Sequence, residues 1–345
     1  MVDAIIKELT IRSDFLSTTL LNSVYFGGGT PSLLSQRELS TIMESINNIY
    51  DLSTDCEVTL EANPDDITQI KAKEIKASGI NRMSIGIQSF YDEDLKFMTR
   101  AHSAAESHQA LQALLSAGFD RITADLIYGF PLLSMDKLRV NIDSLLSYDI
   151  QHISAYALTV EPKTALHHRW KNQLWTPMED SQVARQFRHI EDALDQAGFE
   201  HYEVSNYAKP GAYAVHNTNY WNNTPYLGIG PSAHAYDGQD RYWNVSNNQQ
   251  YMKSISEGII ENTKEQLSAH DRYNEYVMTS LRTQWGLNKN KLKESHAAFH
   301  DHFLQEVGAK LKTGEISETA DHYRLSREGL LFADRIASDL FYIAS

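Results

Sequence analysis

Short apolar runs alternate with longer helical patterns from the start of the chain to about residue 208. This alternation is typical of βα units built around a parallel sheet. The sequence predicts strands at residues 23–26, 57–61, 82–87, 122–127, 152–158 and 202–205. It predicts helices at residues 36–49, 69–77, 104–116, 135–146 and 180–196. The pattern therefore favours an α/β fold.

Three glycines mark the ends of predicted helices. Gly79, Gly118 and Gly198 each follow a helical pattern and precede a predicted strand. Glycine adopts the left-handed backbone conformation that closes a helix at low cost. We therefore expect left-handed caps at these positions.

The pattern changes twice after residue 208, and three segments are expected. Residues 1–208 form the αβ part, and residues 209–267 are rich in Asn, Tyr, Gly and Pro with little periodicity, which predicts a loop-rich contact region. Residues 268–345 turn helical again, which predicts a small, mainly helical C-terminal domain with a short hairpin.

Composition narrows the class of protein. The chain has 345 residues and 45 acidic against 31 basic side chains, a net charge of −14, which disfavours a general nucleic-acid binder. It contains no apolar run long enough for a transmembrane segment, and its first twelve residues suggest an amphipathic helix rather than a signal sequence. We therefore expect a cytoplasmic protein without an internal disulfide, since Cys56 is its one cysteine.

A glycine triplet follows the first predicted strand. Because glycine has no β-carbon, Gly28 and Gly29 would let backbone amides approach a ligand closely. The same residues also suit a plain strand-to-helix turn, with Thr30 as cap and Pro31 in the first helical position. The triplet alone leaves both interpretations open.

Polar side chains stand at or just past the ends of successive predicted strands. Glu61, Gln88 and Asp125 are acceptors at three such positions, where parallel α/β folds collect ligand-binding groups. Each could instead cap the next helix. Arg100 could bind a carboxylate through its planar guanidinium, or be a solvated cation at a helix end.

In order and spacing these motifs resemble the radical S-adenosylmethionine (SAM) proteins, specifically the oxygen-independent coproporphyrinogen III oxidases and their haem-chaperone relatives. The resemblance implies a TIM-like (β/α)6 barrel. The SAM-binding residues that it implies are Gly28, Gly29, Thr30, Glu61, Gln88, Arg100 and Asp125. In that group the glycines and Thr30 would contact the methionyl amino group. The three acceptors would serve amino and ribose groups, and Arg100 would bind the carboxylate.

A second motif distinguishes branches of that group. His216, Tyr220 and Trp221 lie in the run His-Asn-Thr-Asn-Tyr-Trp, which resembles the HNxxYW motif of the haem-chaperone branch. A neutral imidazole can ligate haem iron, and aromatic rings offer flat surface to a porphyrin. From the residues alone, a hydrogen-bonded loop histidine and a core tryptophan are the favoured interpretation. The resemblance implies that all three contact haem and that His216 ligates its iron.

The cysteines of the family are missing here. The group holds a 4Fe-4S cluster with a CxxxCxxC loop between the first barrel strand and the first helix, whereas this chain begins inside what resembles that helix. We therefore expect an incomplete barrel without its first strand, and a chain that starts at an internal methionine or is a fragment. Without cluster thiolates we expect no radical chemistry, so enzyme activity is left open.

The resemblance implies a haem chaperone that binds haem and SAM and delivers haem to acceptor proteins, with membrane-bound proteins among the candidate acceptors. The alternative is an oxygen-independent coproporphyrinogen III oxidase, which decarboxylates two propionates oxidatively. A third possibility is a degenerate SAM-binding module. Carrier and oxidase differ in whether haem or coproporphyrinogen is bound, and the HNxxYW motif points to haem.

Overall fold

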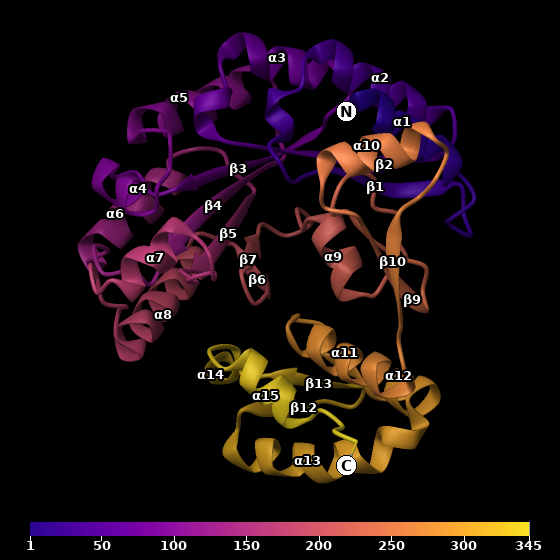
Figure 1. Cartoon of the computed structure of the whole chain (residues 1–345). Helices are drawn as coiled ribbons and strands as arrows, with labels where there is room; N and C mark the ends of the chain where they lie inside the picture. The colour runs from indigo at the N-terminus through magenta and orange to yellow at the C-terminus, as the bar shows by residue number, and fades with distance from the viewer. Residues whose placement is uncertain (345) are drawn as a thin grey trace. The chain divides into compact units, whose positions relative to one another are not determined.

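The computed structural model describes residues 1–344; Ser345, the last residue of the expected C-terminal domain, lies outside this range. Within it, the strands form one seven-stranded sheet and two three-stranded sheets. The large sheet has the order β1-β2-β3-β4-β5-β7-β6 (Figure 1). Its strands are β1 (Leu20–Phe26), β2 (Asp51–Ala62), β3 (Arg82–Gln88), β4 (Ile122–Tyr128), β5 (His152–Ala157), β6 (Glu200–Glu203) and β7 (Asn206–Ala208).

The central strands β2 to β5 are parallel, as the alternation predicts. Their registers pair Glu61 with Ser84, Ile85 with Ala124 and Asp125 with Ser154. Strands β3 and β4 are nearly continuous runs of buried residues, since helices cover the sheet. This arrangement confirms the expected α/β fold.

The last predicted strand, residues 202–205, is wrong in its bounds. The chain instead forms a tight hairpin of β6 and β7, with Val204 and Ser205 in the turn, and β7 pairs antiparallel with both β5 and β6. A local preference for extended backbone does not show where the chain turns back on itself. Pairing of β7 with β5 decides the position of that turn.

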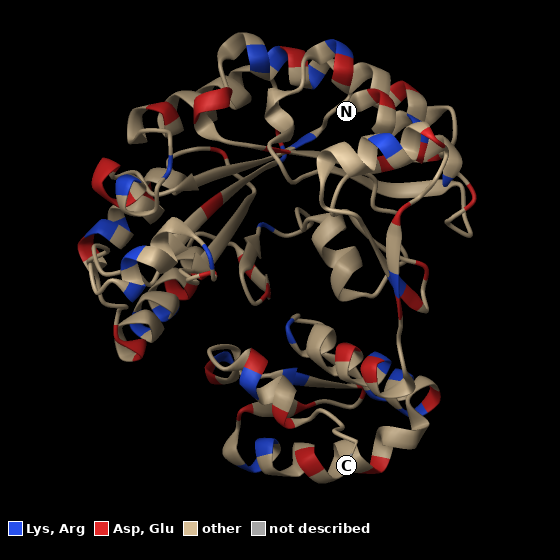
Figure 2. Cartoon of the chain, viewed as in Figure 1, with Lys and Arg blue, Asp and Glu red and all other residues tan. Residues whose placement is uncertain are grey.

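Helices follow most strands of the large sheet. Helices α3, α5, α6 and α8 have the bounds that the sequence predicts, and Figure 1 shows them along the outer side of the sheet. The helical segments of this part are η1 (Pro31–Leu33), α2 (Gln36–Asn47), η2 (Pro64–Asp66), α3 (Gln69–Ala77), α4 (Asp92–Phe97), α5 (Ala104–Ser116), α6 (Met135–Leu146), α7 (Ala165–Lys171) and α8 (Asp180–Gln196). Acidic and basic side chains are interspersed along them (Figure 2).

Local chemistry explains these bounds. Ser103 accepts from the backbone N–H of Glu106, whose carboxylate accepts from the Ser103 N–H in return, a capping box that starts α5. Thr68 and Ser134 cap α3 and α6 in the same way through one hydroxyl each. After α3, α5 and α8, Gly79, Gly118 and Gly198 have φ values of 91°, 83° and 80°, so the expected left-handed caps are confirmed.

Residues 209–267 are more regular than the expected loop-rich region. They contain α9 (Val215–Trp221), β8 (His234–Tyr236), β9 (Asp240–Asn244), α10 (Asn248–Ser256) and β10 (Asn262–Gln266). The strands form an antiparallel sheet in the order β10-β9-β8. Antiparallel pairing here depends on backbone hydrogen bonds rather than on a periodic apolar face, since every residue of β10 is exposed, so hydrophobic periodicity gave no signal.

The last part of the described chain surrounds its own apolar core. Tyr273, Val277, Leu281, Phe303 and Ile336 are fully buried there. The elements are α11 (Ala269–Leu281), β11 (Leu287–Asn288), α12 (Lys289–Ser295), η3 (Ala297–Phe299), α13 (His300–Thr313), β12 (Ile316–Glu318), β13 (His322–Leu325), α14 (Arg327–Leu330) and α15 (Ala333–Asp339), with the sheet order β11-β13-β12. The segment is mainly helical with a short hairpin, as predicted.

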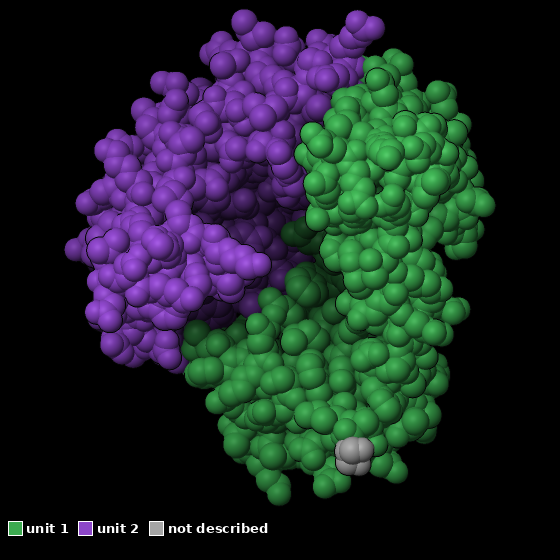
Figure 3. Space-filling view, viewed as in Figure 1, with its two compact units in different colours: residues 1–22, 40–56, 215–345 green, residues 23–39, 57–214 purple. Residues whose placement is uncertain are grey.

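The chain divides into two compact units that differ from the three expected segments (Figure 3). Unit 1 comprises residues 1–22, 40–56 and 215–345, and unit 2 comprises residues 23–39 and 57–214. Helix α1 (Val2–Ile11) is therefore in the same unit as residues that follow it by more than 200 positions. No helix within residues 1–344 is long and apolar enough to span a membrane.

Candidate functional site

Glu61 is fixed at the end of β2 by two donors. The Tyr25 hydroxyl donates to Glu61 Oε1 over 2.7 Å, and the Gly28 N–H donates to Oε2 over 3.1 Å. Burial, followed by the charge of Glu61, raises the pKa of the Tyr25 phenol, which therefore keeps its proton. Both carboxylate oxygens are thus oriented before a ligand arrives.

Asp125 lies within β4. Burial raises the pKa of its carboxyl to about 7, against a hydrogen bond from Ser154, with the charge of Glu61 adding to the rise and that of Arg100 opposing it. The two carboxyls are therefore close enough to repel, and a cation placed between them would relieve that repulsion.

Gln88 and Arg100 meet above Gly86. A β-carbon at Gly86 would lie 2.9 Å from Gln88 Nε2 and 3.0 Å from Arg100 Nη2, so the ends of both side chains would have to shift to admit one. Arg100 Nη2 also donates to Asn63 Oδ1 over 2.9 Å. Arg100 therefore lies beside Gln88 and Asn63. Gln88 Oε1 is buried and has no hydrogen-bond partner within residues 1–344, which leaves an acceptor for a ligand.

The glycine loop offers space beside these groups. At Gly28 and Gly29 an added β-carbon would meet no heavy atom of the described chain within 4 Å, and Gly28 has a φ of 82°. Thr30 precedes the short helix η1 with Pro31 in its first position, but the Thr30 side chain makes no capping hydrogen bond. The loop is therefore a strand-to-helix turn and also leaves the backbone of Gly28 and Gly29 open to a ligand.

Direct contacts or shared electrostatics join five of the predicted SAM residues, Gly28, Glu61, Gln88, Arg100 and Asp125, and Gly29 and Thr30 continue the loop after Gly28. Tyr25, Asn63 and Ser154 join them, and no motif in the sequence pointed to these three. Asn63 lies two residues after Glu61, and Tyr25 lies in the strand before the glycines. Nearness in sequence to a predicted site residue was therefore the signal that could have identified them. Open backbone, an unpaired amide oxygen, two carboxyls and a guanidinium fit the amino, carboxylate and ribose groups of SAM.

The predicted haem residues share one helix. His216 and Tyr220 lie one turn apart on α9, with ring centroids 4.9 Å apart in an edge-to-face arrangement. Burial lowers the pKa of His216 to about 4, so its imidazole is neutral at pH 7. Tyr220 is 44% exposed and can therefore present its ring to a ligand.

Trp221, at the end of α9, is more enclosed. The guanidinium of Arg282 lies 5.2 Å from the centre of its ring, and Arg282 also pairs with Asp334. The indole Nε1 is buried and has no acceptor among the described residues. Trp221 thus fits a core anchor as well as a ligand contact.

Two tyrosines extend the aromatic surface beyond α9. Tyr226 lies 4.7 Å from Tyr220 between ring centres and shares a hydrogen bond with its hydroxyl. Tyr226 and Tyr236 exchange two backbone hydrogen bonds of 2.9 Å. Gly228 makes this pairing possible, since a β-carbon there would lie 1.9 Å from the backbone oxygen of His234.

The residues of this chain do not fit a 4Fe-4S cluster. Cys56, its one cysteine, is buried within β2 rather than in a loop before that strand. Within residues 1–344 no group of three or more His, Cys, Asp or Glu side chains is placed to hold a metal ion. Such clusters are held by several thiolates.

Comparison with known proteins supports the fold and the motifs. The Radical SAM superfamily model matches residues 14–145, and the HemN C-terminal domain model matches residues 267–332. Coproporphyrinogen III oxidase (HemN) from Escherichia coli has a similar structure, with a TM-score of 0.82 and 20% identity over 98% of this chain and 82% of that chain. The fold, and the sequence of residues 14–145, are thus those of a radical SAM protein.

Sequence relatives narrow the class. Heme chaperone HemW from Mycobacterium tuberculosis is 32% identical over 98% of this chain and 85% of its own length. Heme chaperone HemW from Bacillus subtilis is 32% identical over 92% of this chain and 84% of its own length. The chain belongs to the HemW family.

Proposed function

We propose that this protein is a haem chaperone that binds haem on α9 and delivers it to acceptor proteins. In this proposal His216 ligates the haem iron, and Tyr220 and Trp221 contact the porphyrin. SAM binds separately in unit 2 at Gly28, Gly29, Thr30, Glu61, Gln88, Arg100 and Asp125. The cytoplasmic location expected from the sequence is part of the proposal, and cell fractionation tests it.

The observation that carries the proposal is the placement of His216 one turn from the partly exposed ring of Tyr220 on α9. Metal ligation requires a neutral imidazole nitrogen. Its pKa of about 4 keeps His216 neutral throughout the physiological range, so a proton does not compete with iron. Tyr220, one turn away and partly exposed, supplies flat aromatic surface next to that nitrogen.

The relatives favour the chaperone over the oxidase. Four bacterial relatives that carry the name heme chaperone HemW align with 89% to 98% of this chain. The likeness to coproporphyrinogen III oxidase is one of fold, at 20% identity. SAM binding is supported by the polar groups that converge around the glycine loop. Glu61 and Asp125 would accept from the amino and ribose groups of bound SAM, and the haem delivery proposed here depends on no cluster.

A haem titration tests the proposal. We expect the His216→Ala variant to bind haem at least about tenfold more weakly than the wild-type protein and to lose the absorption band of histidine-ligated iron, because an iron ligand is removed. His296→Ala is the matched control, since His296 is also a histidine in unit 1 whose pKa is lowered by burial. Equal haem affinity and equal spectra in wild type and His216→Ala would contradict the proposal.

A further inference from the structure

Gln88, an acceptor of the proposed SAM site, has an unusual backbone. Its φ is +66°, in the left-handed region that side-chain-bearing residues rarely adopt. Such a conformation costs free energy and persists only where the surroundings hold it. This backbone directs the Gln88 amide back over Gly86, next to Arg100. Something must therefore fix the chain directly after Gln88.

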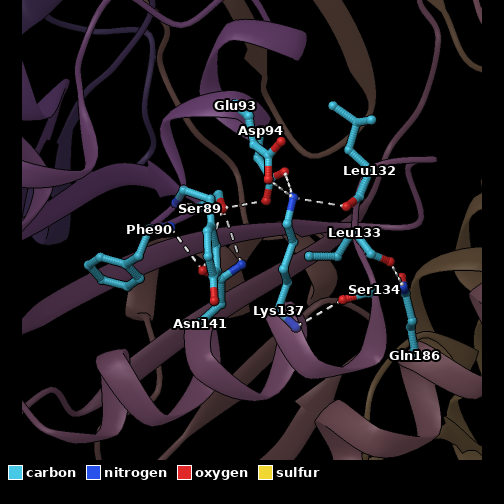
Figure 4. A network of polar contacts seen from close by, with 11 residues as sticks. Ser89, Phe90, Glu93, Asp94, Leu132, Leu133, Ser134, Lys137, Asn141 and Gln186 are labelled. Carbon is cyan, nitrogen blue, oxygen red and sulfur yellow. Dashed lines mark hydrogen bonds and ion pairs between the residues drawn. The ribbon is translucent and has the colours of Figure 1, made fainter.

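Ser89, the next residue, is held from several sides (Figure 4). Its hydroxyl donates to Asp94 Oδ2 over 2.9 Å and accepts from Asn141 Nδ2 over 3.2 Å. Asn141 Oδ1 accepts from the backbone N–H of Phe90 over 2.9 Å. Ser89, Asp94 and Asn141 are each completely buried. The turn after Gln88 is thus fixed by side chains from α4 and α6.

Within residues 1–344, Asp94 is the only charged residue that hydrogen-bonds the Ser89 hydroxyl, and its carboxylate is paired with a lysine. Lys137 of α6 donates to Asp94 Oδ1 over 2.9 Å and to the Leu132 carbonyl over 3.0 Å, and it also pairs with Glu93 (Figure 4). A buried, paired carboxylate has a well-defined position, because leaving either charge unpaired is costly. Asp94 can therefore fix the direction of the Ser89 hydroxyl.

We propose that Asp94 is a positioning residue for SAM binding, which acts through Ser89 to hold Gln88 in its left-handed conformation with its amide directed into the site. This inference rests on the SAM site of the proposed function. Asp94 touches neither Gln88 nor the ligand space. Its effect on affinity must therefore pass through Gln88.

A double-mutant cycle tests this coupling, with SAM as the titrant in calorimetry. We expect Asp94→Asn to weaken SAM binding about tenfold in the wild-type background, because the Gln88 acceptor is no longer oriented. In the Gln88→Ala background the same change is expected to cost less than about twofold. Equal losses in both backgrounds would indicate a merely structural role and overturn the inference.

The controls separate folding from positioning. Asp136→Asn removes a carboxylate from the exposed ion pair with Arg139 on α6 and is expected to leave SAM affinity unchanged. If Asp94→Asn does not fold, Ser89→Ala replaces it in the same cycle. We expect the same loss of SAM affinity in the wild-type background, and equal losses in both backgrounds would again overturn the inference.

A measurement without ligand distinguishes this inference from the proposed function. If the wild-type protein binds no SAM, the proposed SAM site fails, and crystal structures of the wild type and the Asp94→Asn variant decide on Asp94. We expect the variant to release Gln88 from its positive φ. A variant in which the Gln88 backbone and amide stay in place would overturn the positioning role.

Discussion

At the scale of single residues, burial shifts the pKa of two important side chains in the direction that favours the neutral form. Asp125 has its pKa raised to about 7, and His216 has its pKa lowered to about 4. In both cases burial disfavours the charged form, although one group is an acid and the other a base. Neutral His216 suits metal ligation, whereas Asp125 stands near its titration point and would gain its charge when a cation binds.

Asp125 therefore makes stability depend on pH. The ordinary pKa of an aspartate is 3.8 and burial raises that of Asp125 to about 7, so its ionisation destabilises the folded state by an amount that grows as pH rises from about 4 to about 7. We expect Asp125→Asn to remove this cost and to increase the free energy of unfolding at pH 8 relative to pH 4 by up to about 4 kcal/mol.

Urea unfolding of wild type and variant at both pH values measures this difference. Asp120→Asn, an exposed aspartate before the same strand, is the control and should show little change. A pH dependence that is identical in wild type and Asp125→Asn would show that Asp125 does not titrate differently in the fold.

At the scale of elements, a short antiparallel pairing between Tyr226 and Tyr236 places an aromatic ring next to α9. Tyr226 reaches Tyr220 because its backbone pairs with Tyr236, and that pairing requires a residue without a side chain at position 228. Helices in unit 2 are specified more locally, by the caps at Thr68, Ser103 and Ser134. For this reason the helix bounds could be predicted and the small sheet could not.

Gly228→Ala tests the close approach. We expect the free energy of unfolding to fall by about 2–3 kcal/mol, because the new methyl group would overlap the His234 carbonyl. We also expect weaker haem binding, since Tyr226 would shift. Chemical denaturation and haem titration measure the two effects.

The control for this prediction has the opposite sign. Gly308 lies within α13, where an added β-carbon meets no atom within 4 Å. Gly308→Ala is expected to stabilise the protein by about 0.5–1 kcal/mol. Should both alanine variants behave alike, steric overlap at Gly228 would not be the cause.

At the scale of the whole molecule, one buried carboxylate joins distant parts of unit 1. Glu8 of α1 pairs with Arg12 and accepts from the Gly230 N–H at 2.9 Å, from Asn244 Nδ2 at 2.7 Å and from the Tyr251 hydroxyl at 2.6 Å. Arg12 in turn donates to the Gly228 carbonyl. This network explains why α1 belongs to the same unit as residues more than 200 positions later.

Glu8→Ala is therefore expected to destabilise unit 1 by about 3–5 kcal/mol, because Arg12 and three further donors lose their buried acceptor. Hydrogen exchange should show lost protection in residues 228–256, together with a lower denaturation midpoint. Asp3→Ala, at an exposed position of the same helix, is the control. Unchanged protection in residues 228–256 would mean that Glu8 does not hold that segment.

Much of the candidate site could be predicted because its motifs lie at strand ends. Glu61 and Gln88 follow apolar runs, and parallel strands bring such ends to one edge of a sheet. The partners Tyr25 and Ser154 could not be predicted, since each becomes part of the site only through pairing between strands. The roles of Asp94 and Lys137 likewise depend on contacts across 43 residues of sequence.

The sequence by itself determined the α/β class, the bounds of the capped helices and the motifs that identify the family, because these depend on local periodicity, capping and short spacings. Tertiary structure alone decided the β6–β7 hairpin, the small sheet that contains β9, and the protonation of Asp125 and His216. Those features arise from burial and from pairing between residues far apart along the chain. Local sequence does not encode which distant groups will exclude water from a side chain.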